Sequence, residues 1–305
     1  MTCEKAPAHS RRVKPIHIAI GSTTSQPGDV AGNLAQIARF AEQAGAVGAD
    51  VLLTPEMSAS GYGPYPEVLA TAEPAGAGPI YRELARLALA SGAVICAGFV
   101  EAATGKRHLA HYIVYADGKH VVQRKHRVTL VERPLDPPWP LSGHPPDAPD
   151  PADPGQPLEL HFEEFAIKGV KCALAICADG GITGLSDRLA RAGGELLLAP
   201  TAGGGTRDQR VVTADLHSEA GLKKYYDWLE RVFFPGGGLL DCVRFRRALA
   251  AVNLCGFDGR ERYHIGHGMI ISPMGEVPAL IHGLPNLDRQ RPMFTHAVVD
   301  VEETI

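Results

Sequence analysis

The chain has 305 residues, enough for one large domain or two small ones, and 45% of them are apolar while 21% are charged. This composition excludes disorder along the whole chain. The 30 basic and 34 acidic residues give a net charge of -4 without a strong block of either sign, so the charge pattern offers no reason to expect nucleic acid or a membrane as partner.

The apolar runs and the cysteines restrict the class of protein further. The longest apolar runs, Ala173–Ile176 and Leu196–Pro200, are far shorter than the ~20 residues of a membrane-spanning helix. Residues 1–14 lack the apolar segment of a secretory signal, so we expect a cytoplasmic protein. The 6 cysteines have irregular spacings that fit neither a disulfide framework nor a zinc site, and we expect no metal and no cofactor.

Strands and helices alternate in the first third of the chain. After a tail over residues 1–14, short apolar runs predict strands, and apolar residues at helical spacing predict helices that begin at Asp29 and Pro79. The predicted order is strand Ile16–Ile20, helix from Asp29 to Gly45 or Gly48, strand Ala49–Pro55, helix Pro79–Ala90 and strand Val94–Val100. This β-α-β-α order is typical of a layered α/β fold.

The middle of the chain contains a hairpin, a long loop and two further strands. Asp117-Gly118 between the runs His111–Tyr115 and His120–Gln123 predicts the hairpin. Residues 134–157 are dense in Pro, Asp and Gly, which predicts a long surface loop, an insertion in the domain. Strands are predicted at Leu158–Phe162 and Val170–Ile176, and the second is nearly all apolar, as expected when both faces of a sheet are covered.

The last third continues the alternation. A second insertion, over about residues 203–238, lies between two glycine runs and contains a possible amphipathic helix. The predicted elements are helix Leu185–Ala192, strand Glu195–Pro200, helix Leu222–Phe234, helix Leu239–Ala248, strand Ala250–Leu254, a hairpin across Pro273–Glu276 and strand Ala297–Val301. Because no break in composition divides the chain, we expect a single α/β domain over residues 15–305.

Three residues with complementary chemistry each follow directly on a predicted strand. They are Glu56, Lys125 and Cys177. Open α/β sheets build their sites at strand ends. A thiol attacks a carbonyl or nitrile carbon as the thiolate, a carboxylate can take its proton, and an ammonium can stabilise the oxyanion that forms.

Each of the three residues also has an ordinary structural interpretation. Cys177 alone is compatible with a buried strand cysteine, because a free cysteine behaves as a small hydrophobic residue. Glu56 alone is compatible with a turn carboxylate and Lys125 with a solvated lysine at a strand end. Taken singly, these residues leave the choice between structure and catalysis open.

Longer motifs around these residues resemble the nitrilase, or carbon-nitrogen hydrolase, superfamily. The similarity runs in order from about Ile16 to Val301 and so covers nearly the whole chain. The matching segments are Gly48–Glu56 with Gly61-Tyr62, Arg124–Arg127 with Glu132-Arg133, Ala175–Asp179, Arg191–Pro200, Arg247–Gly256 and Gly266–Val277.

The resemblance implies a four-layer αββα sandwich, commonly paired into homodimers or larger homo-oligomers through helices, and a cofactor-free triad. The triad carries over as Glu56, Lys125 and Cys177. Glu132 resembles the family's second glutamate, which orients the lysine and the substrate amide, and Tyr62 matches a pocket-lining position. The backbone N–H of Ala178 is expected at the oxyanion, and Ala178 and Asp179 are expected beside the bound acyl group.

The neighbours of the cysteine favour the amidase-like branch of the family. Ala178 stands where nitrilases usually have tryptophan, and Asp179-Gly180-Gly181 is closer to the aliphatic amidases, although Arg124–Arg127 is more like the nitrilase branch. The leading hypothesis is hydrolysis of a small primary amide or carbamoyl compound to a carboxylic acid and ammonia through a cysteine thioester. The alternatives are a nitrilase that forms an acid or an amide, and a binding or structural family member with little turnover.

Overall fold

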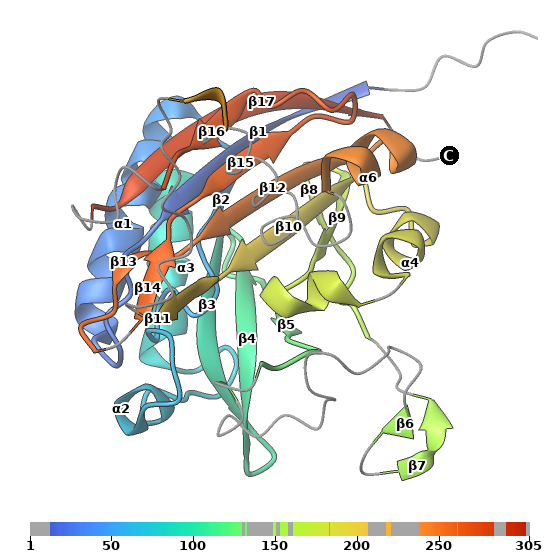
Figure 1. Cartoon of the computed structure of the whole chain (residues 1–305). Coiled ribbons are helices and arrows are strands. Elements are labelled where there is room, and N and C mark those ends of the chain that lie inside the picture. The colour runs from blue at the N-terminus through green and yellow to red at the C-terminus, as the bar shows by residue number, and fades with distance from the viewer. Residues whose placement is uncertain are drawn as a thin grey trace, which may run out of the picture.

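Two six-stranded sheets packed face to face form the centre of the molecule. The computed structural model describes residues 13–129, 132, 149–150, 153–157, 161–182, 184–206, 218–220, 238–260, 262–283 and 291–302. The sheets stack with their strands roughly aligned, as Figure 1 shows.

The first sheet contains the N-terminal strands and the last strand of the chain. Its order is β17 (Met293–Glu302), β1 (Val13–Ser22), β2 (Val51–Leu53), β3 (Val94–Ala103), β4 (Lys106–Val114) and β5 (His120–Arg124). The pairs β1·β2 and β2·β3 are parallel, whereas β17, β4 and β5 add antiparallel strands. The carboxyl ends of β2 and β5 deliver Glu56 and Lys125.

The second sheet repeats this plan with the second half of the chain. Its order is β16 (Ala279–Ile281), β15 (Gly268–Ile271), β12 (Ala248–Asn253), β10 (Leu196–Thr201), β9 (Val170–Leu174) and β8 (Phe165–Ile167). The central strands β12, β10 and β9 are parallel. Cys177 follows β9, at the start of the 3-10 helix η2 (Cys177–Gly181).

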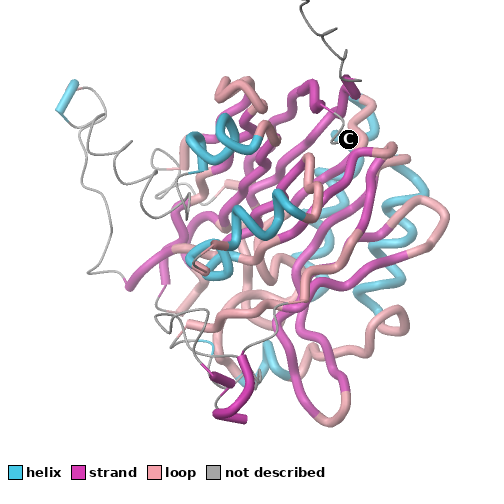
Figure 2. The backbone as a smooth tube through the Cα atoms, turned by 90° about the vertical axis from the view of Figure 1, so that its right-hand side faces the viewer, coloured by secondary structure: helices cyan, strands magenta, loops and turns pink. Residues whose placement is uncertain are grey.

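Helices cover the outer face of each sheet, which confirms the predicted four-layer αββα sandwich. The helices α1 (Val30–Val47) and α3 (Pro79–Ser91) pack on the first sheet, and α4 (Leu185–Arg191) and α6 (Gly238–Phe245) pack on the second. Figure 1 and, after a quarter turn, Figure 2 show these helix pairs on opposite sides of the stacked sheets. Between the sheets lies a continuous apolar core built from both halves of the chain.

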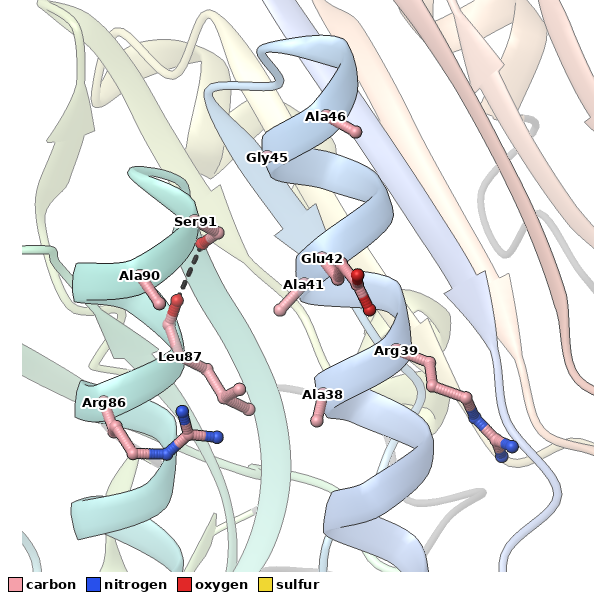
Figure 3. Close-up of a pocket in the computed structure, with 10 residues that line it drawn as sticks. All are labelled: Ala38, Arg39, Ala41, Glu42, Gly45, Ala46, Arg86, Leu87, Ala90 and Ser91. Carbon is pink, nitrogen blue, oxygen red and sulfur yellow. Dashed lines mark hydrogen bonds between the residues drawn. The ribbon is translucent and has the colours of Figure 1, made fainter.

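The first helix pair packs closely because the contact positions carry small residues. A Cβ atom at Gly45 of α1 would lie 3.1 Å from the Cα atom of Ser91 on α3, so a larger residue would fit only if the α3 backbone shifted slightly. Figure 3 shows the groove that this approach creates, with Ala38, Ala41 and Ala90 along it. The predicted N-cap of α1 is confirmed, since the Asp29 carboxylate accepts a hydrogen bond from the N–H of Gly32.

A small third sheet was not predicted from the sequence. It consists of β11 (Gly204–Thr206), β14 (Arg262–Ile265) and β13 (Cys255–Phe257), all antiparallel. It lies at the end of β10, because the residues that follow β10 lead directly into β11. A two-stranded pair, β6 (Pro149–Asp150) and β7 (Asp153–Pro157), interrupts the predicted loop at 134–157, and a short helix, α2 (Pro66–Leu69), lies between β2 and α3.

Several predicted boundaries were wrong. β1 begins at Val13, inside the predicted tail, because β17 extends far enough to pair with it. His161 and Phe162 belong to no strand, and the strand expected there forms later as β8, which turns tightly at residues 168–169 into β9. The helix predicted to reach Ala248 ends at Phe245, because Ala248 already pairs with β10.

Other sequence predictions fall outside the described residues. These are the tail before Val13, the amphipathic helix at Leu222–Phe234 and most of the two insertions. Among the residues that the structure describes, no helix combines the length and the apolar character needed to cross a bilayer.

Candidate active site

Glu56 lies in a tight turn that begins where β2 ends. Thr54 fixes this turn, since its hydroxyl donates to the carbonyl of Cys96 at 2.8 Å and lies 2.8 Å from the hydroxyl of Ser58. The next residue, Met57, has a φ of 51°, a left-handed backbone conformation that residues other than glycine adopt rarely. The turn therefore points the Glu56 carboxylate into the interior at 1% exposure.

Gly98 of β3 makes the close approach of this turn possible. A Cβ atom at position 98 would lie 2.1 Å from the backbone nitrogen of Met57 and 2.9 Å from the carbonyl carbon of Glu56. The N–H of Ala59 also donates to the carbonyl of Gly98 at 2.9 Å. Only glycine fits at this position without moving the Glu56 turn.

Lys125 joins two carboxylates in a buried ion cluster. Its ammonium nitrogen lies 2.6 Å from Oε1 of Glu56 and 2.8 Å from each carboxylate oxygen of Glu132. None of the three side chains is more than 1% exposed. The two glutamates, which lie 76 positions apart in the sequence numbering, are therefore bridged by one cation in a site from which bulk water is excluded.

The cluster sets the protonation of its members. Burial by itself would lower the pKa of the Lys125 ammonium, but Glu132 and Glu56 reverse this effect and hold the pKa well above its ordinary value. Burial raises the pKa of the Glu56 carboxyl from 4.5 to about 7, with Lys125 opposing the rise and Glu132 adding to it. Lys125 is therefore charged at neutral pH, and Glu56 can both accept and release a proton there.

Cys177 approaches this cluster from the second sheet. It is half-buried at the first position of η2 and has a φ of 49°, a second left-handed residue at the site. Its thiol interacts with the Glu56 carboxylate, and it is close enough to Lys125 for the ammonium to influence its pKa. Burial, with a further contribution from Glu56, raises the pKa of the Cys177 thiol well above its usual range, so the resting cysteine is protonated.

Asp179 connects the turn that carries Cys177 to the segment that follows Lys125. Its Oδ1 atom accepts the backbone N–H groups of His126 at 2.9 Å and Arg127 at 2.7 Å, and its Oδ2 atom accepts that of Ile176 at 3.1 Å. The side chain is fully buried. These bonds join the turn that carries Cys177 to the two residues that follow Lys125, and both carboxylate oxygens accept backbone N–H groups.

Tyr62 and Glu132 complete the first wall of the site. The Tyr62 hydroxyl donates to Oε1 of Glu132 at 2.6 Å, and the N–H of Thr129 donates to Oε2 at 2.7 Å. Both side chains are buried, at 3% and 0% exposure. Ala178 is half-buried in the first turn of η2, directly after Cys177. Every candidate residue chosen from the sequence thus lies at this site or, for Asp179, in the bonds that support it.

The sequence did not point to Ala202 and His264, which form the opposite wall. The backbone of Ala202, just after β10, hydrogen-bonds to the Cys177 thiol and partly opposes the rise in its pKa that burial causes. Its carbonyl oxygen lies 3.1 Å from Nδ1 of His264 on β14, and the imidazole meets the Tyr62 ring edge-on with the ring centroids 5.5 Å apart. The unpredicted third sheet brings His264 to the site, whereas Ala202 comes from the end of β10 in the second sheet. Among the described residues, no group of His, Cys, Asp and Glu side chains could hold a metal ion.

Comparisons with known proteins agree with this arrangement. The model of the carbon-nitrogen hydrolase family matches residues 17–226. The curated "hydrolase in pqqF 5'region" of Pseudomonas protegens is 31% identical over 191 residues, and the alignment covers 62% of this chain and 60% of that protein. The chain thus matches about three fifths of the length of this relative.

Solved amidase structures share the fold. An amidase from Nesterenkonia sp. has a TM-score of 0.64 and 20% identity, with 94% of this chain and 90% of that chain covered. A cysteine-to-alanine mutant of the Nesterenkonia sp. AN1 amidase in complex with butyramide also has a TM-score of 0.64, with 18% identity over 95% of this chain and 90% of that chain.

Proposed function

Because the chain belongs to the carbon-nitrogen hydrolase family, we propose that it hydrolyses a small primary amide or carbamoyl compound to a carboxylic acid and ammonia through a thioester on Cys177. One observation carries this proposal. The Lys125 ammonium is buried between the Glu56 and Glu132 carboxylates, and the Cys177 thiol borders the same cluster. A base, an oxyanion partner and a nucleophile are then present together in a water-poor site.

Glu56 acts as the general base for the first step. The thiol is protonated at rest because its pKa is raised, whereas the Glu56 carboxyl, with a pKa of about 7, is partly ionised at neutral pH. Proton transfer from sulfur to Glu56 therefore accompanies attack on the substrate carbon instead of preceding it. A new S–C bond forms, the C=O π pair moves to oxygen, and the thiol proton rests on Glu56.

Lys125 and the backbone N–H of Ala178 stabilise the oxyanion. Lys125 remains charged, and its ammonium is already fixed by Glu56 and Glu132 before substrate arrives. Ala178 lies in the first turn of η2, where a helix has no carbonyl of its own for the N–H groups. Donors fixed in advance cost no reorganisation during reaction, and one such donor contributes about 10²- to 10³-fold in rate.

The second half of the cycle reverses these roles. The tetrahedral intermediate collapses, the C–N bond breaks, and Glu56 returns its proton to the nitrogen so that ammonia leaves. Glu56 then takes a proton from water, the resulting hydroxide attacks the thioester, and the proton goes back to sulfur as the acid departs. Glu132, which contacts Lys125 through both oxygens, orients the ammonium throughout.

The amide is favoured over the nitrile as substrate. The solved structures similar to this chain are named as amidases, and one contains butyramide. In another, acrylamide is attached by Michael addition to the active-site cysteine of the Nesterenkonia enzyme. A nitrilase activity is the second candidate, and a binding or structural protein with little turnover is the third. We also keep a cytoplasmic location and a homodimer or larger homo-oligomer as predictions.

A paired substrate panel separates these candidates. Short aliphatic primary amides and the nitriles of equal chain length are incubated with the wild type and with Cys177→Ala, and ammonia and acid are quantified. The proposal expects equal amounts of acid and ammonia from amides, slower reaction of nitriles and no reaction with the variant. Faster turnover of nitriles would establish the nitrilase, and equal background for wild type and variant across the panel would favour the binding protein.

A further inference from the structure

The third sheet carries an arginine whose guanidinium has no acidic partner among the residues that the structure describes. Arg262 is half-buried on β14, and its Cζ atom lies 5.6 Å from the centre of the Tyr62 ring. The buried Nε atom makes no hydrogen bond, and within the described parts of the chain no carboxylate forms an ion pair with this side chain. Because the guanidinium is always charged, a partly desolvated one without an acidic partner is stabilised when an anion binds beside it.

A neighbouring arginine shows what a satisfied version of this arrangement looks like. Arg260 lies over the Tyr65 ring with its Cζ atom 4.8 Å from the ring centre, and its guanidinium also bonds to the carboxylate of Glu67. Arg262 has the same relation to Tyr62 without the acid. The nearby Asp258 forms no ion pair with Arg262 among the described residues, and instead its Oδ1 atom accepts the backbone N–H groups of Arg260 and Arg262 and its Oδ2 atom accepts the Tyr65 hydroxyl at 3.3 Å.

Arg262 lies on the wall that leads away from the nucleophile. Residues two apart on a strand point to the same face, so Arg262 shares its face with His264, about 7 Å along β14. His264 contacts the Ala202 carbonyl, and the Ala202 backbone also hydrogen-bonds to the Cys177 thiol. Both His264 and Arg262 contact Tyr62, the residue that donates to Glu132. A continuous path of contacts therefore connects the reacting sulfur with the unpaired guanidinium.

His264 adds no positive charge to this wall. It is 1% exposed, and burial lowers its pKa to about 4, with Arg262 contributing to the decrease. At neutral pH the imidazole is uncharged, and its buried Nε2 atom has no hydrogen-bond partner among the described residues. Arg262 is thus the cation of this wall, and the imidazole offers a polar edge between it and Ala202.

We propose that Arg262 binds a carboxylate at the far end of the acyl chain, so that the preferred substrates are short monoamides of dicarboxylic acids. The inference rests on the proposed function, since it assigns the acyl group of that reaction. In this arrangement the amide carbon of the substrate lies at Cys177 and the acyl chain runs past Ala202 and His264. The terminal carboxylate then accepts hydrogen bonds from the N–H groups of the Arg262 guanidinium. A planar carboxylate fits this fork in a bidentate manner.

Matched substrates test the proposal directly. The monoamides of butanedioic, pentanedioic and hexanedioic acid are compared with neutral alkyl amides of the same chain lengths, and kcat/KM is measured for wild type, Arg262→Gln, Arg262→Lys and Arg260→Gln. The wild type should prefer one carboxylate-bearing amide, and Arg262→Gln should reduce the preference ratio about 10- to 100-fold. Arg262→Lys should retain part of the ratio, because it keeps the charge and loses the fork. Arg260→Gln, the matched control, should leave the ratio as it is.

The salt dependence of kcat/KM distinguishes an arginine that binds the substrate from one that only supports the fold. Added salt screens a partly exposed pair, so kcat/KM for the carboxylate amide should fall with ionic strength in the wild type more steeply than in Arg262→Gln. Preference of the wild type for the neutral amide would overturn the proposal. An equal loss of kcat/KM on both substrates in Arg262→Gln would overturn it as well, because that result identifies Arg262 as a support for Tyr62.

A binding measurement keeps this test separate from the test of catalysis. Calorimetric titration of Cys177→Ala with each matched pair should show tighter binding of the carboxylate amide, and Arg262→Gln in the same background should remove the difference. Equal binding of the two amides overturns the inference even if the wild type hydrolyses amides. Preferential binding with no ammonia release from any amide by the wild type supports the anion site and refutes the proposed reaction.

Discussion

The two sheets contribute to the site in different ways. The first sheet supplies Glu56, Lys125 and Glu132, which are bonded to one another and almost fully buried before any substrate is present. The second sheet supplies Cys177, which is half-buried in a left-handed turn, and the wall formed by Ala202. The charged groups are thus assembled as one unit within the first half of the chain, while the proposed nucleophile approaches them from the second sheet.

This difference indicates which changes affect the fold and which affect only the reaction. Removing one of several charged groups that compensate each other in the interior destabilises the fold as well as affecting the reaction, because the others are left uncompensated. Substitution of a half-buried cysteine removes fewer packing contacts and should cost less unfolding free energy. The predictions below use this contrast, beginning with the largest expected effect.

Replacing the nucleophile should remove activity and leave the fold intact. We expect Cys177→Ala to lose about 10⁴-fold or more in turnover of the best amide, with a urea midpoint close to that of the wild type. Cys172→Ala is the matched control, since Cys172 is buried in β9 five positions earlier and belongs to the core between the sheets. It should lose stability and keep activity. If Cys172→Ala also lost its turnover while remaining folded, the assignment of Cys177 would be wrong.

Removing the ammonium should damage both fold and reaction. Lys125→Met leaves two carboxylates buried beside each other, and breaking a buried ion pair costs about 3 to 5 kcal/mol of unfolding free energy. Turnover should fall by about 10²- to 10³-fold because the oxyanion loses a donor. Urea denaturation and ammonia release measure the two effects. A variant as stable as the wild type would contradict the view that the cluster stabilises the fold as a unit.

The raised pKa of Glu56 has consequences with a definite sign. As general base Glu56 must be ionised, so kcat/KM should rise with pH and reach half its plateau near the pKa of about 7. For stability, the folded protein binds this proton more tightly than the unfolded chain, whose ordinary value is near 4.5. Between pH 4.5 and 7 the unfolded state therefore has fewer protons bound, and the contribution of Glu56 to stability decreases as pH rises.

Glu56→Gln isolates that effect. Relative to this variant, the wild type should lose unfolding free energy from pH 4.5 to 7, as measured by urea titration at several pH values. The opposite slope would show that the carboxyl is ionised in the folded state throughout this range. The variant should also lose about 10²- to 10⁴-fold in turnover.

Tyr62→Phe should have the smallest effect. It removes one hydrogen bond to Oε1 of Glu132, which retains both contacts with Lys125 and the N–H of Thr129. We expect a loss of about 1 to 3 kcal/mol in stability and a reduction in turnover of about tenfold or less. A loss of turnover as large as that of Lys125→Met would mean that the hydroxyl acts on the substrate directly.

The sequence was sufficient for the sheets and for the residues that follow their strands. Glu56, Lys125 and Cys177 could be predicted because each comes directly after an apolar run and lies within a motif of the family. The anchoring role of Asp179 could not, because its three N–H donors come from two segments about 50 positions apart. Only the folded backbone shows that these segments meet.

The third sheet escaped prediction for a related reason. Its strands are only three or four residues long, too short for a clear periodicity, and β11 pairs with a strand far along the chain. Neither Arg262 nor His264 was consequently singled out from the sequence as a residue of the site. The same limitation applies to the acyl group of the proposed substrate, because Arg262, which we propose binds its far end, lies on β14.

The most direct test of the central claim is to trap the acyl group during turnover. The wild type is mixed with its best amide, quenched in acid within the first turnover and analysed by intact mass and peptide mapping. We predict a mass increase equal to the acyl group on the peptide that contains Cys177, which disappears as the substrate is exhausted. Rapid ammonia release with the acyl group on another cysteine, or on none, would contradict the account.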